Sequence, residues 1–260
     1  MTHASRSRFA ELVRAEPIDV GLAALLVGAE VESDLDVDES LAVLDALAAA
    51  ARPYVPVGAS PAEAAQGLRV ALGEQGGFAG FADDYDDVRS SLLHAVLRRR
   101  RGLPLLLSVV WVEVATRLGV AAYYCALPGQ VVVGIGDPED VHMVVDPFNG
   151  GRLLPGAVVA PLPVPELLMR LLTNIRVLTT RQERAMDAAR TRLWAVELSL
   201  LLPRHPLALR RERGELLVRL GAHLDGAAEL EQYADLVESV DEAAAQTCRR
   251  SARQARARLN

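Results

Sequence analysis

The chain has 260 residues, of which 51% are hydrophobic and 4% aromatic, so it can bury one large or two modest aliphatic cores and is not a disordered chain. Its formal net charge of −6 excludes the basic balance typical of nucleic-acid-binding domains. All 28 cationic side chains are arginine, which a GC-rich genome explains more simply than a function does.

Cysteine usage and the longest apolar run indicate the cellular environment. Cys125 and Cys248 lie far apart and form no CxxC pair, so we expect no disulfide framework, no metal site and no cofactor. The N-terminal stretch has no apolar core or cleavage site of a secretory signal. Residues 103–112 form the longest nearly apolar run, about half of what a membrane span needs. We therefore expect a cytoplasmic protein that does not contact a membrane.

The N-terminal quarter has helical spacing of apolar residues, interrupted by an acidic turn and by a loop rich in proline and glycine. The predicted helices are residues 8–14 leading into 20–31, residues 40–51, and residues 61–72, the last ended by glycines at 73, 76 and 77.

Residues 78–102 predict a helix whose charged ends complement its macrodipole. Aspartates at 83, 84, 86 and 87 stand at the expected entry, and arginines at 98–101 fill the expected last turn before Gly102. We interpret the aspartates as capping groups rather than cation ligands, and the arginines as a helix end rather than a nucleic-acid site. His94 is expected beside the apolar face and partly exposed.

Pro104 opens the next predicted helix at its first position, and Gly119 ends it. Three β-branched runs follow at residues 120–126, 130–136 and 141–145, and their separators are turn residues suited to antiparallel pairing. These runs predict a small antiparallel sheet. A proline-marked stretch then leads back to helix.

From about Arg181 the chain is charged and rich in alanine and leucine, which predicts helix only. Within it, a helix hairpin is predicted with Gly214 and Gly226 at packing positions and Gly221 in the turn. This spacing resembles a tetratricopeptide repeat, whose unit is a helix pair of about 34 residues. The predicted domains are residues 1–177 and a helical tail, residues 178–260.

Three motifs occur in one order along the chain: RRRRGLPLLLS, LPGQ and DPFNGGRLL. Together with the repeat-like tail they resemble the SirB type of transglutaminase-like proteins. The resemblance implies an α+β fold, with N-terminal helices and a papain-like core that contains a small antiparallel sheet. In the wider superfamily, such a core holds a cysteine at a helix N-terminus, where the helix dipole favours the thiolate, and a histidine and an acid on adjacent strands.

The resemblance places the cysteine position at or near Pro104, which has no nucleophile. Ser108, one turn further along, is the nearest hydroxyl. At the histidine position the SirB family typically has LPGHF, whereas this chain has LPGQV and therefore Gln130, whose amide does not titrate near neutral pH. Asp146 matches the acid of the DPF motif. One triad member of three remains, so catalysis by a triad is not supported.

Each of these residues also has a structural interpretation. Asp146 can cap the turn that follows it, and Gln130 can orient the preceding turn instead of contacting a ligand. Cys125, with His142 and Asp146 nearby in sequence, is the remaining candidate nucleophile. It lies inside a predicted strand without a helix dipole, where a free cysteine is usually a small buried hydrophobe.

The leading hypothesis from the sequence is a non-catalytic interaction or regulatory protein. It would bind a protein or peptide partner through the repeat tail, and a ligand through the degenerate cleft around Pro104, Gln130 and Asp146. The alternative is an amide hydrolase or acyl transferase that uses Cys125 or Ser108 in an altered geometry. A third hypothesis is a purely structural subunit of a larger complex.

Overall fold

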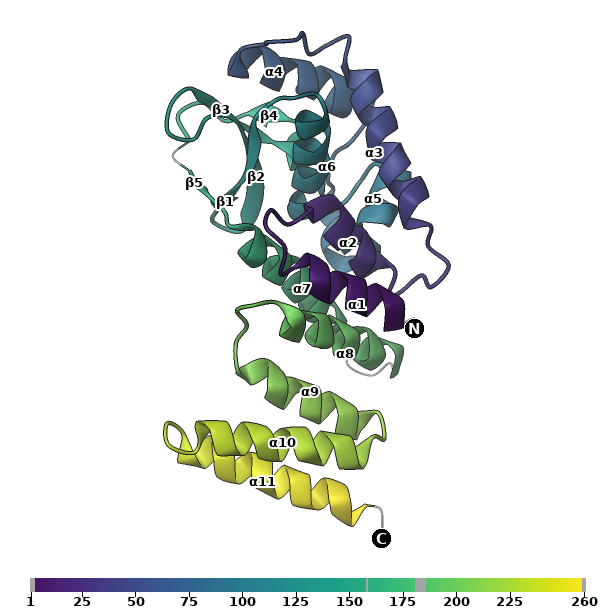
Figure 1. Ribbon diagram of the computed structural model, residues 1–260, viewed down its shortest axis with the longest axis vertical. Coiled ribbons are helices and arrows are strands. Elements are labelled where there is room, and N and C mark those ends of the chain that lie inside the picture. Colours follow the sequence, from purple (N-terminus) through teal and green to yellow (C-terminus); the bar gives the residue numbers. More distant parts are fainter. Residues whose placement is uncertain (1–2, 158, 181–185, 259–260) are drawn as a thin grey trace. The chain divides into compact units, whose positions relative to one another are not determined.

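The computed structural model describes residues 3–157, 159–180 and 186–258. It divides into two compact units, Met1–Leu171 and Leu172–Asn260, which are treated separately below. The first unit combines helices with a small antiparallel sheet, and the second is helical (Figure 1). The α+β fold predicted from the sequence is thereby confirmed.

The second, third and fourth helices of this unit begin at capping side chains. The Asp19, Asp36 and Ser60 side chains accept hydrogen bonds from backbone N–H groups in the first turns of α2, α3 and α4, which satisfies donors that a helix leaves free. The helices are α1 (His3–Leu12), α2 (Val20–Gly28), α3 (Val37–Ala51) and α4 (Pro61–Leu68).

The helix predicted for residues 61–72 runs past Gly73 and ends at the next two glycines, with Gly76 as its C-cap and Gly77 at φ 68°. It continues as a π-helix, η1 (Arg69–Gln75), so Gly73 lies inside the helical segment. A Cβ atom on Gly73 would lie 2.1 Å from the carbonyl oxygen of Gly150. This glycine therefore serves close packing between two backbones rather than termination.

The helix predicted to enter at the aspartate cluster begins later. Two 3₁₀ turns, η2 (Ala82–Asp86) and η3 (Val88–Ser91), precede α5 (Leu93–Arg99). The buried Asp84 carboxylate accepts hydrogen bonds from the Phe81 amide, the Ser90 hydroxyl and the Arg101 guanidinium. These contacts fold the segment around one carboxylate, so the simple capping interpretation is incomplete for Asp84. Asp87 does cap η3, through the amide of Arg89.

The end of α5 also differs from the expectation. Arg100, and not a glycine, adopts the left-handed conformation with φ 56°, and its guanidinium donates to the carbonyl of Gly76. Arg101 lies beyond the helix and forms an isolated bridge with Ala79. His94, expected to be partly exposed, is 4% exposed because it is packed beneath Glu32 and against Gly28.

Helix α6 (Pro104–Arg117) forms the centre of the first unit, and Pro104 is in its first turn, as predicted. Residues 104–112 are all buried. The helix packs against strands β1 (Ala122–Leu127) and β2 (Gln130–Gly136) and against helices α2, α3 and α5 (Figure 1).

The sheet has five strands in the order β4-β3-β2-β1-β5, and all neighbours are antiparallel. Pro128 and Gly129 make the two-residue turn of the β1–β2 hairpin, with Gly129 at φ 78°. The sequence prediction missed the two short edge strands, β4 and β5. The strands are β1 (Ala122–Leu127), β2 (Gln130–Gly136), β3 (His142–Asp146), β4 (Arg152–Leu153) and β5 (Ala160–Pro161). A 3₁₀ turn, η4 (Pro147–Asn149), follows β3.

The second unit contains the predicted helix hairpin, α9 and α10, with Gly221 at φ 91° in its turn. Gly214 and Gly226 lie at the contact between the two helices, where a Cβ atom on either would meet the backbone of the other. Ion pairs from Arg213 to Glu197 and Glu229 connect α9 to both of its neighbours. The division between the two units falls within α7 (Val164–Thr180). The helices that follow are α8 (Met186–Leu201), α9 (Ala208–Arg219), α10 (His223–Val237) and α11 (Glu242–Ala257).

We predict that Gly226→Ala destabilises the hairpin. The added methyl would lie 2.7 Å from the Gly214 carbonyl oxygen and 2.6 Å from a methyl of Val218. We expect about 1–3 kcal/mol of overpacking, offset only in part by the better helix propensity of alanine. Urea unfolding followed by circular dichroism measures the change. The exposed Ala228→Leu on the same helix is the control, and equal stability of both variants would contradict the close contact.

Candidate functional site

The position expected for a nucleophile is the first turn of α6. Pro104 is buried there, and its nitrogen carries no proton to donate. Ser108, one turn further, is also buried, and its hydroxyl donates to the carbonyl of Val131 on β2 at 3.1 Å. The serine hydroxyl is therefore used to join the helix to the sheet.

Gln130 is the first residue of β2, opposite Leu127 across the hairpin, and is half-buried. Its neighbour Val131 is the residue that Ser108 contacts, so Gln130 lies close to the first turns of α6. Strand β3 pairs with β2 only from Val133 onward, which leaves the Gln130 end of β2 beyond that ladder.

Asp146 ends β3 and is buried. One carboxylate oxygen accepts from the backbone amides of Phe148 and Asn149, at 3.1 and 3.4 Å, and the other accepts from the Asn149 side chain at 2.6 Å. The Arg152 guanidinium lies 3.8 Å away. These are the turn-capping bonds expected of an aspartate before a turn, and they occupy both carboxylate oxygens.

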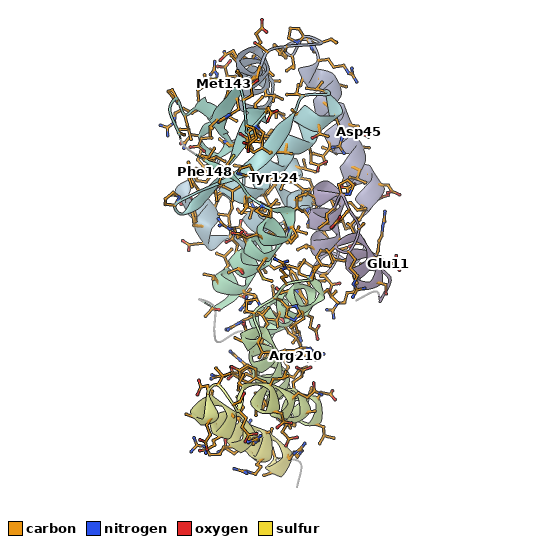
Figure 2. The ribbon with its side chains drawn as sticks, turned by 60° about the vertical axis from the view of Figure 1, so that its left-hand side comes forward. Glu11, Asp45, Tyr124, Met143, Phe148 and Arg210 are labelled. Atoms are coloured by element: carbon orange, nitrogen blue, oxygen red, sulfur yellow. The ribbon has the colours of Figure 1, made fainter. Side chains whose placement is uncertain are left out.

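Aromatic side chains lie beside this turn. The rings of Tyr85 and Phe148 are 5.7 Å apart, and the amide of Gly80 donates to the Phe148 carbonyl at 2.8 Å. Partial burial, and then the negative charge of Asp146, raise the pKa of Tyr85. Met143, near the start of β3, and Phe148, just past its end, are labelled in Figure 2. The sequence interpretation missed Tyr85, because it belongs to the aspartate-rich segment far from the DPF motif.

The antiparallel register brings the predicted site residues to one end of the sheet. Val133 pairs with Val145, so Asp146 and Gln130 both extend toward the same end, and the Ser108 bond to Val131 places the start of α6 there as well. A nucleophile with an adjacent base needs a thiol or hydroxyl within hydrogen-bond reach of a titratable group. At this end the buried serine hydroxyl donates to a backbone carbonyl, and the carboxylate is occupied by its own turn.

Cys125 lies in β1 opposite Val132 and is buried in an apolar cluster with Val132 and Val144. Burial raises the pKa of its thiol to about 11, the reverse of what an activated nucleophile requires. His142 lies at the other end of β3 from Asp146, where its ring contacts Tyr123. The structure therefore does not bring Cys125, His142 and Asp146 together as a triad.

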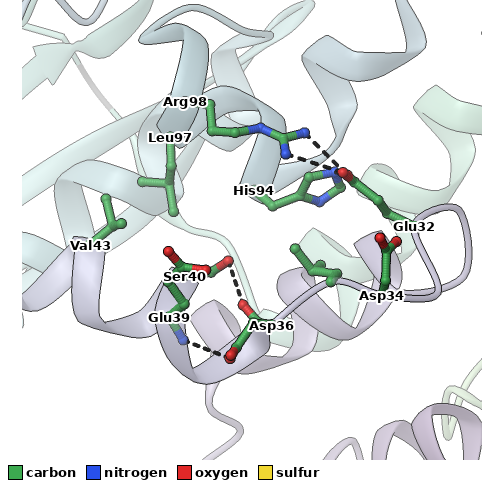
Figure 3. A pocket seen from close by; sticks show the side chains of 10 residues that line it. Glu32, Asp34, Asp36, Glu39, Ser40, Val43, His94, Leu97 and Arg98 are labelled. Atoms are coloured by element: carbon green, nitrogen blue, oxygen red, sulfur yellow. Dashed lines mark hydrogen bonds and ion pairs between the residues drawn. The ribbon is translucent and has the colours of Figure 1, made fainter.

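Residues 3–157, 159–180 and 186–258 contain no cluster of three or more histidine, cysteine or acidic side chains suited to a metal ion. Within the same residues, no helix has the length and apolar character needed to cross a membrane. A hollow of ≈ 270 Å³ lies elsewhere, between α5 and the loop that joins α2 to α3 (Figure 3). Its lining does not include Pro104, Gln130 or Asp146.

Comparison with known proteins agrees with this architecture. The model of the transglutaminase-like superfamily matches residues 38–182, more than half of the chain and including the whole candidate site. The chain belongs to the transglutaminase-like superfamily.

Individual relatives are similar to this chain over part of its length. Two UPF0162 proteins from two strains of Xylella fastidiosa are each 32% identical over 185 residues, which is 63% of this chain and 64% of each relative. A UPF0162 protein of Pseudomonas aeruginosa is 36% identical over 141 residues, which is 53% of this chain and 50% of that relative. The matches thus span half to about two thirds of the length of these relatives.

We predict that Cys125 reacts slowly with alkylating reagents while the protein is folded. Its pKa of about 11, against 9.0 for an ordinary thiol, leaves little thiolate at pH 8, and burial blocks access. The raised pKa also means that the stability contributed by the neutral thiol is complete below about pH 9 and declines toward pH 11. Mass spectrometry of the Cys248→Ser variant, folded and in urea, measures the rates. Fast labelling of the folded form that levels off below pH 8 would show an activated thiol.

We predict that Asp146→Ala destabilises the first unit by about 1–3 kcal/mol, because the turn at Phe148 and Asn149 loses three part-buried hydrogen bonds to a carboxylate. Asp146→Asn keeps one acceptor oxygen and should lose less. The exposed turn residue variant Asp140→Ala serves as the control. Thermal unfolding compares the three, and an Asp146→Ala protein as stable as the control would rule out the capping role.

Proposed function

We propose that this protein is a non-catalytic transglutaminase-like protein of the SirB type that acts as an interaction or regulatory module in the cytoplasm. The observation that carries the proposal is the state of the three triad positions. Pro104 offers no nucleophile, Gln130 offers no base, and both oxygens of Asp146 are bonded to the turn that follows it. A fold that keeps these positions without their reactive groups is suited to binding rather than cleavage.

The helical second unit supports a role in binding a protein or peptide partner. We interpret the α9–α10 hairpin, with its paired glycines, as a unit of the tetratricopeptide type, and stacked pairs of this type form extended binding surfaces. Leu224 and Leu236 on α10 are 62% and 55% exposed, which leaves apolar area available for a partner.

The alternative, an amide hydrolase or acyl transferase, gains no support from the geometry. Ser108 donates its hydroxyl to a backbone carbonyl inside the core, and the pKa of Cys125 is raised by burial. Either residue would need a rearranged core before it could attack a substrate.

The full chain should neither release ammonia from glutamine-containing peptides nor incorporate an amine into them above the buffer rate. In parallel, a photo-crosslinker at Leu224 or Leu236 should trap a cellular protein, whereas one at the exposed Val57 in the first unit should not trap the same protein. Turnover by the wild type that is lost in a folded Asp146→Asn variant would refute the non-catalytic assignment. Identical crosslinks from all three positions would refute the role of the tail.

A further inference from the structure

A single carboxylate holds the loop between α2 and α3 against α5. The Nε2 atom of His94 lies 2.7 Å from one oxygen of Glu32, and the Arg98 guanidinium donates to both oxygens at 3.1 Å each. Figure 3 shows these side chains at the edge of the hollow described above. We call Glu32, His94 and Arg98 the loop clamp.

The surroundings of His94 fix its neutral form. The side chain is 4% exposed, and its Nδ1 atom is buried with no hydrogen-bond partner among the described residues. Nδ1 faces Gly28 so closely that a Cβ atom there would lie 2.3 Å away. The neutral ring with its proton on Nε2 fits, because it donates to Glu32. A second proton, on Nδ1, would point at a CH₂ group that cannot accept it, and an unsatisfied buried donor is costly.

The charges nearby do not compensate a protonated His94. Burial lowers the pKa of His94, Glu32 partly opposes this, and the Arg98 charge lowers the pKa further. The neighbouring helix α2 contains no charged residue. Other charged groups on the elements packed around α5 have ion-pair partners of their own: Glu30 with Arg6, Arg89 with Asp87, and Arg117 with Glu113 and Asp45. Three further acidic residues line the hollow, namely Asp34, Asp36 and Glu39.

The direction of the pH dependence follows from these contacts. The hydrogen bond from Arg98 is the main cause that lowers the pKa of Glu32, so Glu32 stays ionised at mildly acidic pH and His94 is the group that titrates. The pKa of His94 in the closed clamp lies below its ordinary value of 6.5. The closed state is therefore fully favoured above pH 6.5 and loses that advantage as the pH falls through the lowered pKa.

We propose that the loop of residues 29–36 is an acid-sensitive flap that the loop clamp holds closed at neutral pH. A second proton makes burial of the ring against Gly28 unfavourable, and when the ring moves into water it gives up its bond to Glu32. Of the clamp, only the Arg98 contact then joins the loop to α5. The flap then leaves α5 while the rest of the first unit stays folded. Its opening exposes Leu97 of α5, which lines the hollow and is buried while the flap is closed.

Hydrogen exchange of the full chain tests this directly. The amides of Val31 and Glu32 bond to the Gly28 carbonyl, and the Leu35 amide bonds to the Glu32 carbonyl. A peptide covering residues 29–36 therefore reports the loosening of these turns once the flap loses its support on α5. Between pH 7.5 and 5.5, after correction for intrinsic exchange rates, we expect its protection to fall roughly three- to tenfold, with α6 unchanged. His94→Gln, which can still donate to Glu32 and does not titrate, should abolish the fall. The exposed-face variant His142→Gln should retain it.

Two results would overturn the flap. One is wild-type protection of residues 29–36 that does not change with pH, or that falls equally in His94→Gln. The other is loss of protection in the loop only together with α6, which would indicate global acid unfolding. The comparison of residues 29–36 with α6 uses the wild type alone, so it tests the flap even if His94→Gln does not fold.

Discussion

Helix α6 lacks a polar face over most of its length, and this constraint shapes the first unit. Residues 104–112 are buried on all sides, so the sheet must cover one side of the helix and α2, α3 and α5 the other. The one hydroxyl in this stretch, on Ser108, would be costly to bury unpaired. It donates to the Val131 carbonyl, which also fixes the position of the helix along β2.

The last turns of α6 add a polar anchor. Glu113 accepts from the Gly21 amide at the N-terminus of α2, where a negative charge is favoured by the helix dipole. A Cβ atom on Gly21 would lie 2.7 Å from the Glu113 carboxyl carbon, so glycine is needed for the approach. Arg117 bonds to Glu113 and to Asp45 of α3. The Glu113–Arg117 pair thus joins α6 to α2 and α3, and it fixes the position of the buried helix between them.

The sequence predicted those features that depend on local pattern. The start of α6 at Pro104, the hairpin turn at Gly129 and the order of the site motifs follow from residue types and spacing alone. The errors come from contacts between distant residues. The Asp84 carboxylate collects donors from Ser90 and Arg101, and His94 is buried beneath Glu32, 62 positions earlier in the chain; neither contact has a periodic signal. Edge strands of two residues are too short to produce any pattern.

The candidate site residues differ from those of a reactive cysteine site in what their polar groups bind. In a reactive cysteine site, the polar groups are free to act on a substrate. Helix amides stabilise a thiolate, a histidine serves as the base, and an acid orients the histidine. Here the corresponding groups stabilise the fold itself. Pro104 removes an amide that could have held an anion, and Asp146 gives both oxygens to its own turn. Polar groups that are satisfied internally stabilise the native state, whereas groups held ready for a substrate cost stability. The residues at these positions therefore contribute to the stability of the first unit instead of leaving polar groups free at this end of the sheet.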